Sequence, residues 1–178
     1  MKFFQFAIIV LTLIIMSGCS PKLTGITKIK GDIVPIQKKT IIVFFAPNCD
    51  ENIQVLNELS EINNNFNPKY NLAFVVNPAK YTLNNMHQVI NNNELHFFKA
   101  YFDDQNKYAQ LNKVKKTPYV FIVDKDANVL YQGAASNMAI EMKTGDKIEH
   151  YLLDALKAIE KGDKAKPHIV LMKGCVLE

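Results

Sequence analysis

The segment Thr40–Leu56 constrains the fold of this chain more than any other stretch. Its residues 41–45 are all β-branched or aromatic, the run ends at Ala46-Pro47-Asn48, and Cys49 follows directly. A short apolar run of this composition predicts a buried strand, and the amphipathic residues after Cys49 predict a helix. The sequence therefore predicts a strand, a tight turn and a helix whose first turn carries a thiol.

The position of Cys49 supports two interpretations. A helix N-terminus presents unpaired backbone N–H groups and the positive end of the helix dipole, and both favour thiolate over thiol. Cys49 is therefore a candidate nucleophile. A cysteine at this place is equally typical of a small buried hydrophobic residue, and its position alone does not separate the two.

The charge of the chain gives little support for nucleic-acid binding. The net charge is +4, and all 21 basic residues are lysines, because the sequence contains no arginine. These lysines are scattered and form no basic helix face, which argues against a nucleic-acid partner. The length that remains after the N-terminal segment suits one domain.

The N-terminal segment resembles a bacterial lipoprotein signal. Residues 3–16 are apolar apart from Gln5 and Thr12, and the sequence Met-Ser-Gly-Cys that ends at Cys19 is similar to a lipobox. The run is short for a membrane span and suits a signal peptide. We therefore expect a signal peptide over residues 1–18, acylation of Cys19, and a tether over residues 19–38. Acyl chains would hold the protein on the outer side of a bacterial membrane, facing the periplasm or the exterior, where disulfides persist. An ordinary secretory signal or a short anchor remains the alternative.

The remaining chain alternates between strand and helix patterns. We expect a domain over residues 39–162 and a C-terminal extension over residues 163–178. The expected strands cover residues 40–46, 70–76, 95–102, 119–124 and 129–132, and the expected helices cover residues 50–65, 83–91, 103–114 and 147–161. This order predicts an α/β fold with a mixed central sheet flanked by helices, in which the last hairpin forms an antiparallel edge.

Two of the expected helices have a clear apolar stripe. The first would bury Ile53, Leu56, Leu59 and Ile62, which follow helical spacing. The last would bury a similar set, namely Ile148, Tyr151, Leu152, Leu156 and Ile159. Gly162 follows that helix as its expected C-terminal cap.

Three patches together resemble the thioredoxin-like superfamily, in particular its extracytoplasmic redoxins. They are residues 44–49, the pair Thr117-Pro118 with the strand and turn up to residue 133, and the tail that ends in Gly174-Cys175. The resemblance implies a thioredoxin-like fold and a thiol-disulfide oxidoreductase without a cofactor. It also implies a cis Thr117–Pro118 bond that faces Cys49, and a groove shaped by Thr117, Pro118 and Pro47. The substrate would be a protein or small-molecule disulfide or thiol. Taken alone, Pro118 is equally typical of a proline at the entry of a strand.

The chain departs from the family's usual Cys-x-x-Cys motif, because Asn52 occupies the second cysteine position. Resolving a mixed disulfide requires a second thiolate, so this motif alone cannot perform dithiol exchange. Cys175 is the candidate resolving thiol, and we hypothesise a Cys49–Cys175 disulfide that is either a redox couple or a structural staple. A tail cysteine without a partner is the alternative. A non-catalytic binding protein that kept only the fold is the competing functional class.

Peroxidase chemistry and metal binding receive less support from the sequence. Ile42 and Ala46 stand where the peroxiredoxin pattern has proline and threonine or serine, and the arginine of that family is absent. The four histidines have no ligand spacing, so we expect no metal site; they are His87, His96, His150 and His168.

Overall fold

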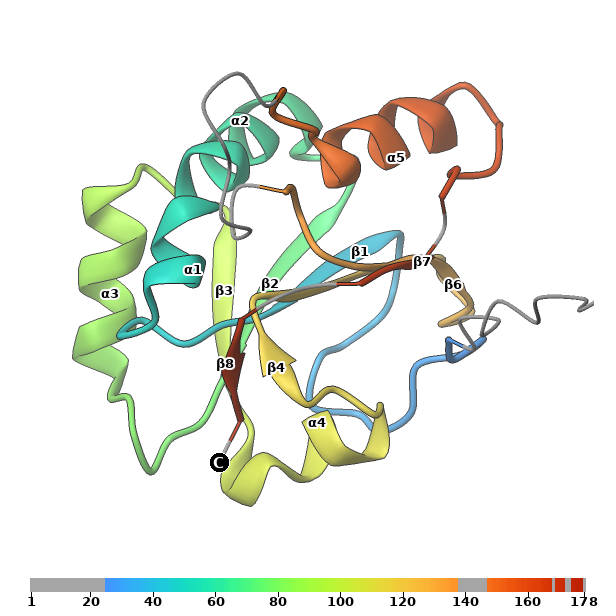
Figure 1. The fold of residues 1–178 in the computed structure, drawn as a ribbon. Helices are drawn as coiled ribbons and strands as arrows, with labels where there is room; N and C mark the ends of the chain where they lie inside the picture. Colours follow the sequence, from blue (N-terminus) through green and yellow to red (C-terminus); the bar gives the residue numbers. More distant parts are fainter. Residues whose placement is uncertain (1–24, 138–146, 168, 172–173, 178) are drawn as a thin grey trace, which may run out of the picture.

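The computed structural model describes residues 25–137, 147–167, 169–171 and 174–177 (Figure 1). It is an α/β fold in which a mixed sheet is flanked by helices, as the sequence predicts. The strands are β1 (Thr40–Phe44), β2 (Asn71–Val76), β3 (Phe98–Phe102), β4 (Lys116–Thr117), β5 (Tyr119–Val123), β6 (Val129–Gly133), β7 (Ile169–Val170) and β8 (Cys175–Val176). The helices are α1 (Asp50–Gln54), α2 (Leu56–Phe66), α3 (Leu83–Asn92), the 3₁₀ turn η1 (Asp104–Asn106), α4 (Lys107–Leu111) and α5 (Tyr151–Glu160).

The central sheet has six strands in the order β3-β2-β1-β5-β6-β7. Strand β1 lies inside it, parallel to β2 and antiparallel to β5. The expected hairpin of β5 and β6 forms, but β6 is not the edge. Strand β7, from the C-terminal extension, pairs in parallel with β6 and takes the edge position. The extension is therefore part of the sheet.

Strand β1 is buried on both faces and divides the core in two. Ile41 and Val43 belong to the cluster beneath α2 and α5, whereas Ile42 and Phe44 belong to the cluster on the side of α4. This alternation follows from the two-residue period of a strand. A strand covered on both faces is a nearly continuous run of apolar residues, which explains the apolar run that follows Thr40 in the sequence.

The segment expected to be a free tether contacts the fold from Ile26 onward. The side chain of Gln132 accepts a hydrogen bond from the Ile26 amide at 3.0 Å and donates to its carbonyl oxygen at 2.8 Å. Lys28 forms a β-bridge with Asn128, and Ile29 is buried. The expected signal peptide and Cys19 lie outside the described residues. Within the described ranges, no helix is both long enough and apolar enough to span a membrane.

The expected helix over residues 50–65 is interrupted at Val55, and its buried stripe differs from the prediction. Asn52 is fully buried, whereas Ile53 is 52% exposed. The buried positions Asn52, Val55 and Leu59 follow the three- and four-residue spacing of one helix face. The prediction of Ile53 as an inward residue is therefore wrong, because a polar residue takes the inward position.

The last helix begins at Tyr151 rather than at residue 147. The side chain of Asn137 explains the difference, because it donates to the Lys147 carbonyl at 2.9 Å and accepts from the Glu149 amide at 2.9 Å. These bonds hold residues 147–149 outside the helix, and Ile148 is exposed rather than buried. At the other end, Gly162 has a φ of +84°, the left-handed conformation typical of a glycine that ends a helix.

Candidate active site

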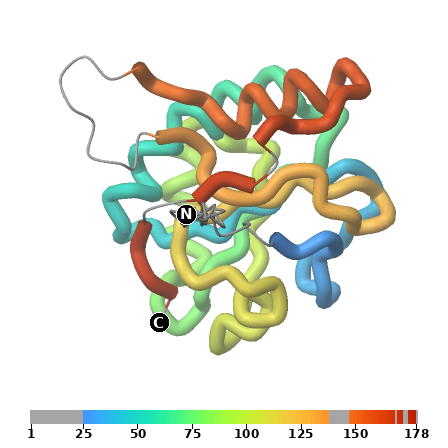
Figure 2. The backbone as a smooth tube through the Cα atoms, turned by 45° about the vertical axis from the view of Figure 1, so that its right-hand side comes forward, coloured from blue at the N-terminus to red at the C-terminus, as the bar shows by residue number. Residues whose placement is uncertain are grey.

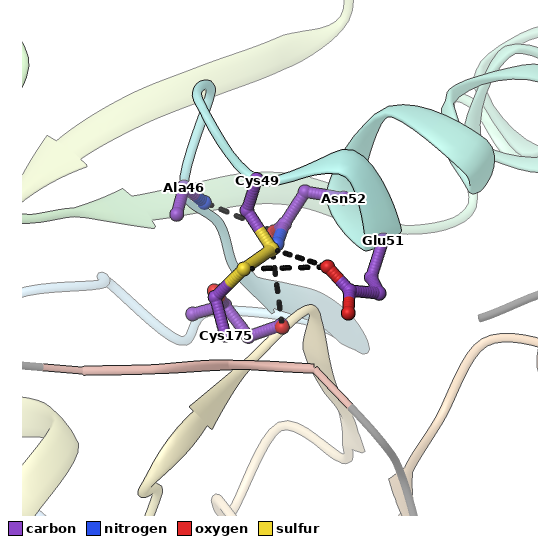
Figure 3. The surroundings of a disulfide bond; sticks show 6 residues. Ala46, Cys49, Glu51, Asn52 and Cys175 are labelled. Atoms are coloured by element: carbon purple, nitrogen blue, oxygen red, sulfur yellow. Dashed lines mark hydrogen bonds between the residues drawn. A yellow bond between two sulfur atoms is a disulfide. The ribbon is translucent and has the colours of Figure 1, made fainter. Parts of the chain in front are cut away.

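The two cysteines of the described chain form a disulfide. The sulfurs of Cys49 and Cys175 are 2.12 Å apart and their Cα atoms 6.2 Å apart, although the residues are 126 positions apart in sequence. The hypothesised pairing is therefore present in the structure, and the alternative of a tail cysteine without a partner is wrong. The bond joins the first helical turn after β1 to the last strand of the chain (Figure 3).

Cys49 lies at the N-cap of α1. Its amide donates to the Ala46 carbonyl at 3.1 Å, which closes the turn after β1, and its own carbonyl accepts from the Asn52 amide at 2.9 Å. The residue is only 3% exposed. The predicted strand, turn and thiol-bearing helix are thus all present. Cys49 is both buried and at a helix N-terminus, and its role as a nucleophile stays a prediction.

Cys175 reaches this place because β8 pairs with β4. The two strands form a separate antiparallel sheet in which Thr117 is opposite Cys175 and Lys116 is opposite Val176. The Leu177 amide extends the pairing by donating to the Lys115 carbonyl at 3.0 Å. Figures 1 and 2 show the C-terminal end of the chain beside this segment, away from the edge where β7 lies.

The Thr117–Pro118 peptide bond is cis, as the resemblance implies. The carbonyl oxygen of Thr117 lies 3.9 Å from the sulfur of Cys49, so this bond faces the disulfide. Burial raises the pKa of Tyr119, the next residue, which keeps its phenol neutral. Pro47 lies in the turn before Cys49 and is partly exposed. The role of Pro47 in a groove stays a prediction.

Asn52 is a site residue whose contacts the sequence does not disclose. Its side-chain oxygen accepts from the Ala46 amide at 2.9 Å (Figure 3), and its side-chain nitrogen donates to the hydroxyl of Thr117 at 3.1 Å. All these groups are buried or nearly so. Asn52 therefore connects the turn before Cys49 to the strand that pairs with the tail.

The carboxylate of Glu51 points toward both sulfurs (Figure 3). One of its oxygens, Oε2, lies 3.1 Å from the sulfur of Cys49 and 3.3 Å from that of Cys175. In the reduced form this oxygen is placed to accept a hydrogen bond from either thiol. The negative charge of the Glu51 carboxylate at this distance would also oppose the ionisation of each thiol.

The disulfide borders a small cavity of about 150 Å³. Its walls include Phe45, Ala46, Asn77, Tyr81 and Leu177, together with the two cysteines. Among the described residues, Cys49, Glu51 and Cys175 are also the one group of side chains close enough to share a metal ion. Both sulfurs are engaged in the disulfide, whereas metal binding by cysteine requires thiolates.

Comparisons with known proteins agree with this geometry. A family model described as thioredoxin-like matches residues 37–129, more than half of the chain. No curated protein matches the chain. Many solved structures match the chain, and three of them that share its fold serve as examples; all three are less than 25% identical to the chain. An uncharacterized conserved protein from Geobacillus kaustophilus has a TM-score of 0.59 and 22% identity, with 79% of this chain and 80% of that chain covered.

The other two structures are more distant in sequence. A hypothetical protein from Sinorhizobium meliloti 1021 has a TM-score of 0.60 and 14% identity, with 80% of each chain covered. A thioredoxin-like protein in its oxidized form has a TM-score of 0.52 and 15% identity, with 68% of this chain and 86% of that chain covered.

Proposed function

The chain belongs to the thioredoxin-like family, and from this membership we propose that it is a thiol-disulfide oxidoreductase whose redox pair is Cys49 and Cys175. The observation that carries the proposal is the disulfide between these residues beside the cis Thr117–Pro118 bond. The tail cysteine takes the role that the second cysteine of a Cys-x-x-Cys motif has elsewhere in the family. Thr117 and Pro118 border the substrate groove.

The chemistry needs two exchange steps. In the reduced protein, the Cys49 thiolate attacks one sulfur of a substrate disulfide; that bond breaks, a Cys49–substrate disulfide forms, and one substrate thiolate leaves. The Cys175 thiolate then attacks the Cys49 sulfur, which releases the second substrate thiolate and forms the Cys49–Cys175 disulfide. Two electrons pass to the substrate. An external dithiol, either a small molecule or a protein, reduces the pair again by the same steps in reverse.

The two cysteines differ in burial, and this difference suits Cys49 as the nucleophile and Cys175 as the resolving thiol. Cys49 is almost completely buried and lies at a helix N-terminus, where the backbone N–H groups and the helix dipole favour a thiolate against the opposing charge of Glu51. Cys175 is partly exposed on a two-residue strand, so it can leave Cys49 when β8 separates from β4. A nucleophile at the start of a helix and a resolving thiol on a short strand suit the two-step exchange.

The N-terminal motif supports a location for this activity. We propose that residues 1–18 are removed as a signal peptide and that acyl chains on Cys19 hold the domain at the outer surface of a bacterial membrane. An oxidising compartment of this kind permits the disulfide to persist.

Reduction of insulin disulfides, with dithiothreitol as electron donor, tests the proposal. The wild type, Cys49→Ser and Cys175→Ser are compared in a Cys19→Ser background, so that only the two site thiols are present. We expect wild type to accelerate the reduction, Cys49→Ser to lose the acceleration, and Cys175→Ser to accumulate a mixed disulfide on Cys49. If wild type and Cys49→Ser give the same rate, the competing class, a non-catalytic binding protein, is correct.

A further inference from the structure

We propose that the cavity beside Gly25, which is lined by Lys113, Lys115 and Lys116, binds the phosphate headgroup of an anionic phospholipid and holds this face of the domain against the membrane. The partner is therefore the bilayer itself. This assignment rests on the proposed function in one respect, the acylation of Cys19, and not on the redox activity. The cavity is called the lysine cavity below.

The lysine cavity has a volume of about 300 Å³ and carries charge of one sign. Lys113, Lys115 and Lys116 are exposed, and no aspartate or glutamate is among the described residues that line the cavity. Within the part of the chain that the structure describes, none of the three lysines forms an ion pair. Three ammonium groups around one cavity attract an anion, and lysine is a common ligand of phosphate.

Apolar side chains form another part of the cavity wall. They are those of Ile26, Ile169, Val170 and Leu171. Leu171 is 70% exposed, which is an unfavourable place for a leucine in water. Binding to a membrane surface combines buried apolar area with attraction to anionic lipids, and the lysine cavity offers both. Free inorganic phosphate would use the lysines alone.

The chain before the domain limits how far this cavity can lie from the membrane. Gly25, the first described residue, lines the cavity, and five residues separate it from Cys19. A chain covers at most about 3.6 Å per residue, so the two positions are no more than about 22 Å apart in any conformation. Acyl chains would place Cys19 at the membrane surface. The lysine cavity is therefore within reach of the headgroups.

The range of the electrostatic attraction makes this closeness important. Each lysine near an anionic membrane strengthens binding about fivefold, but salt screens the attraction over about 10 Å. Only lysines on the face nearest the bilayer therefore contribute. A docked domain should protect the lysines of the cavity and leave lysines on other faces open to solvent.

Acetylation by sulfo-N-hydroxysuccinimide acetate, which does not cross membranes, tests this protection. The full chain is produced in a bacterium that processes lipoproteins, purified in detergent and added to preformed vesicles. These consist of phosphatidylcholine alone or of phosphatidylcholine mixed with phosphatidylglycerol. Mass spectrometry gives the acetylation rate of each lysine. Lys99, Lys157 and Lys161 are the internal controls, because they are exposed and lie outside the lysine cavity.

We expect phosphatidylglycerol to slow acetylation of the three cavity lysines at least about fivefold and to change the control rates by less than about twofold. Concentrated sodium chloride should remove the difference. Equal slowing at all six lysines would reveal attraction without a docking face and would overturn the proposal. So would the absence of slowing, or a chain that leaves the anionic vesicles. The same protection by inorganic phosphate on phosphatidylcholine vesicles would also overturn it, because the ligand would then be the free ion.

Two variants test the apolar wall with the same change of charge. Leu171→Asp places a carboxylate at the cavity, where it offsets the lysines and repels the phosphate. We expect the effect of phosphatidylglycerol on the cavity lysines to fall below about twofold. Leu83→Asp is the matched control, since Leu83 is 51% exposed and begins α3, outside the cavity. Equal effects in the two variants would contradict the proposal.

The same spectra separate this surface from the lipid anchor, because they also give the mass of the N-terminal peptide. Acylated Cys19 with unprotected cavity lysines would refute the docking face and leave the anchor intact. Protected cavity lysines without acyl chains on Cys19 would support the docking face and refute the anchor. The redox activity is measured separately by the insulin assay.

Discussion

The side chain of Asn52 donates a hydrogen bond to the hydroxyl of Thr117 across 3.1 Å, inside the protein. Asn52 occupies the place of the second cysteine of the family motif, and Thr117 is opposite Cys175 in the β4–β8 pairing. One polar contact therefore connects the helix that presents Cys49 to the strand that receives the tail. The residue at the usual thiol position therefore contacts the strand that pairs with Cys175, the distant cysteine bonded to Cys49.

Replacing Asn52 with alanine should destabilise the oxidised protein by about 2–4 kcal/mol. The Ala46 amide and the Thr117 hydroxyl would lose their Asn52 partners in a buried place. Urea unfolding of the oxidised protein gives the free energy of unfolding. Asn57→Ala, on the exposed face of α2, is the control and should change stability by less than about 0.5 kcal/mol. Equal losses for the two variants would contradict this role of Asn52.

Gly133→Ala should disturb the tail at β7, before the chain reaches β8. Gly133 has a φ of +133°, and a Cβ atom there would lie 2.1 Å from the carbonyl oxygen of Val170. Strand β7 must therefore move away from β6, and Cys175 should form its disulfide less readily in glutathione buffers. Gly162→Ala is a matched control, because its φ of +84° imposes backbone strain but its Cβ would meet no atom within 4 Å. A weakened disulfide in both variants would refute the link to β7.

The free energy of unfolding should fall as pH rises, because the buried carboxyl of Glu58 loses its proton. Burial raises the pKa of Glu58 from 4.5 to about 7, while His150 at 3.5 Å lowers it in part and Glu61 raises it. The folded state therefore holds a proton that the unfolded chain releases above about pH 4.5, and this stabilisation is lost as pH rises through 7. Wild type should lose about 3 kcal/mol relative to Glu58→Gln between pH 4.5 and 8. If the free energies of unfolding of the two proteins changed with pH in parallel, Glu58 would not be the source of the pH dependence.

Acylation of Cys19 is expected to control where the protein is found. In a bacterium that processes lipoproteins, the wild type should partition into the detergent phase of Triton X-114, and Cys19→Ala into the aqueous phase. Mass spectrometry of the N-terminal peptide should show acyl chains on Cys19 and no residues before it. An aqueous wild type with an unmodified cysteine would exclude the lipid anchor.

Much of the fold follows from local pattern. The strand that becomes β1, the turn after it and the helix after Cys49 are all predictable, because an apolar run and an amphipathic run adjoin a proline. The phase of that helix is not predictable. Ile53 is the apolar residue and Asn52 the polar one. Burial of Asn52 is favourable because the Ala46 amide and a hydroxyl 65 positions away both bond to its side chain.

The route of the tail is also beyond local pattern. Strands β7 and β8 have two residues each, too few for a periodic signal. Their positions depend on partners elsewhere: the close approach that Gly133 permits, and the edge of β4. The sequence therefore leaves the Cys49–Cys175 pairing open, while it identifies both cysteines. The burial of Ile29 is likewise not predictable from local pattern, because it lies in an irregular segment whose contacts depend on the folded structure.

The measurement that tests the redox pair most directly is an equilibrium titration in glutathione buffers of graded potential. Free thiols are alkylated at each potential, and the peptides that contain Cys49 and Cys175 are quantified by mass spectrometry. We predict that the linked pair converts to two alkylated cysteines in one reversible, two-electron transition. A disulfide that stays intact in the most reducing buffer would identify a structural staple, and two free thiols in the most oxidising buffer would exclude the pair; either result would contradict the proposed oxidoreductase.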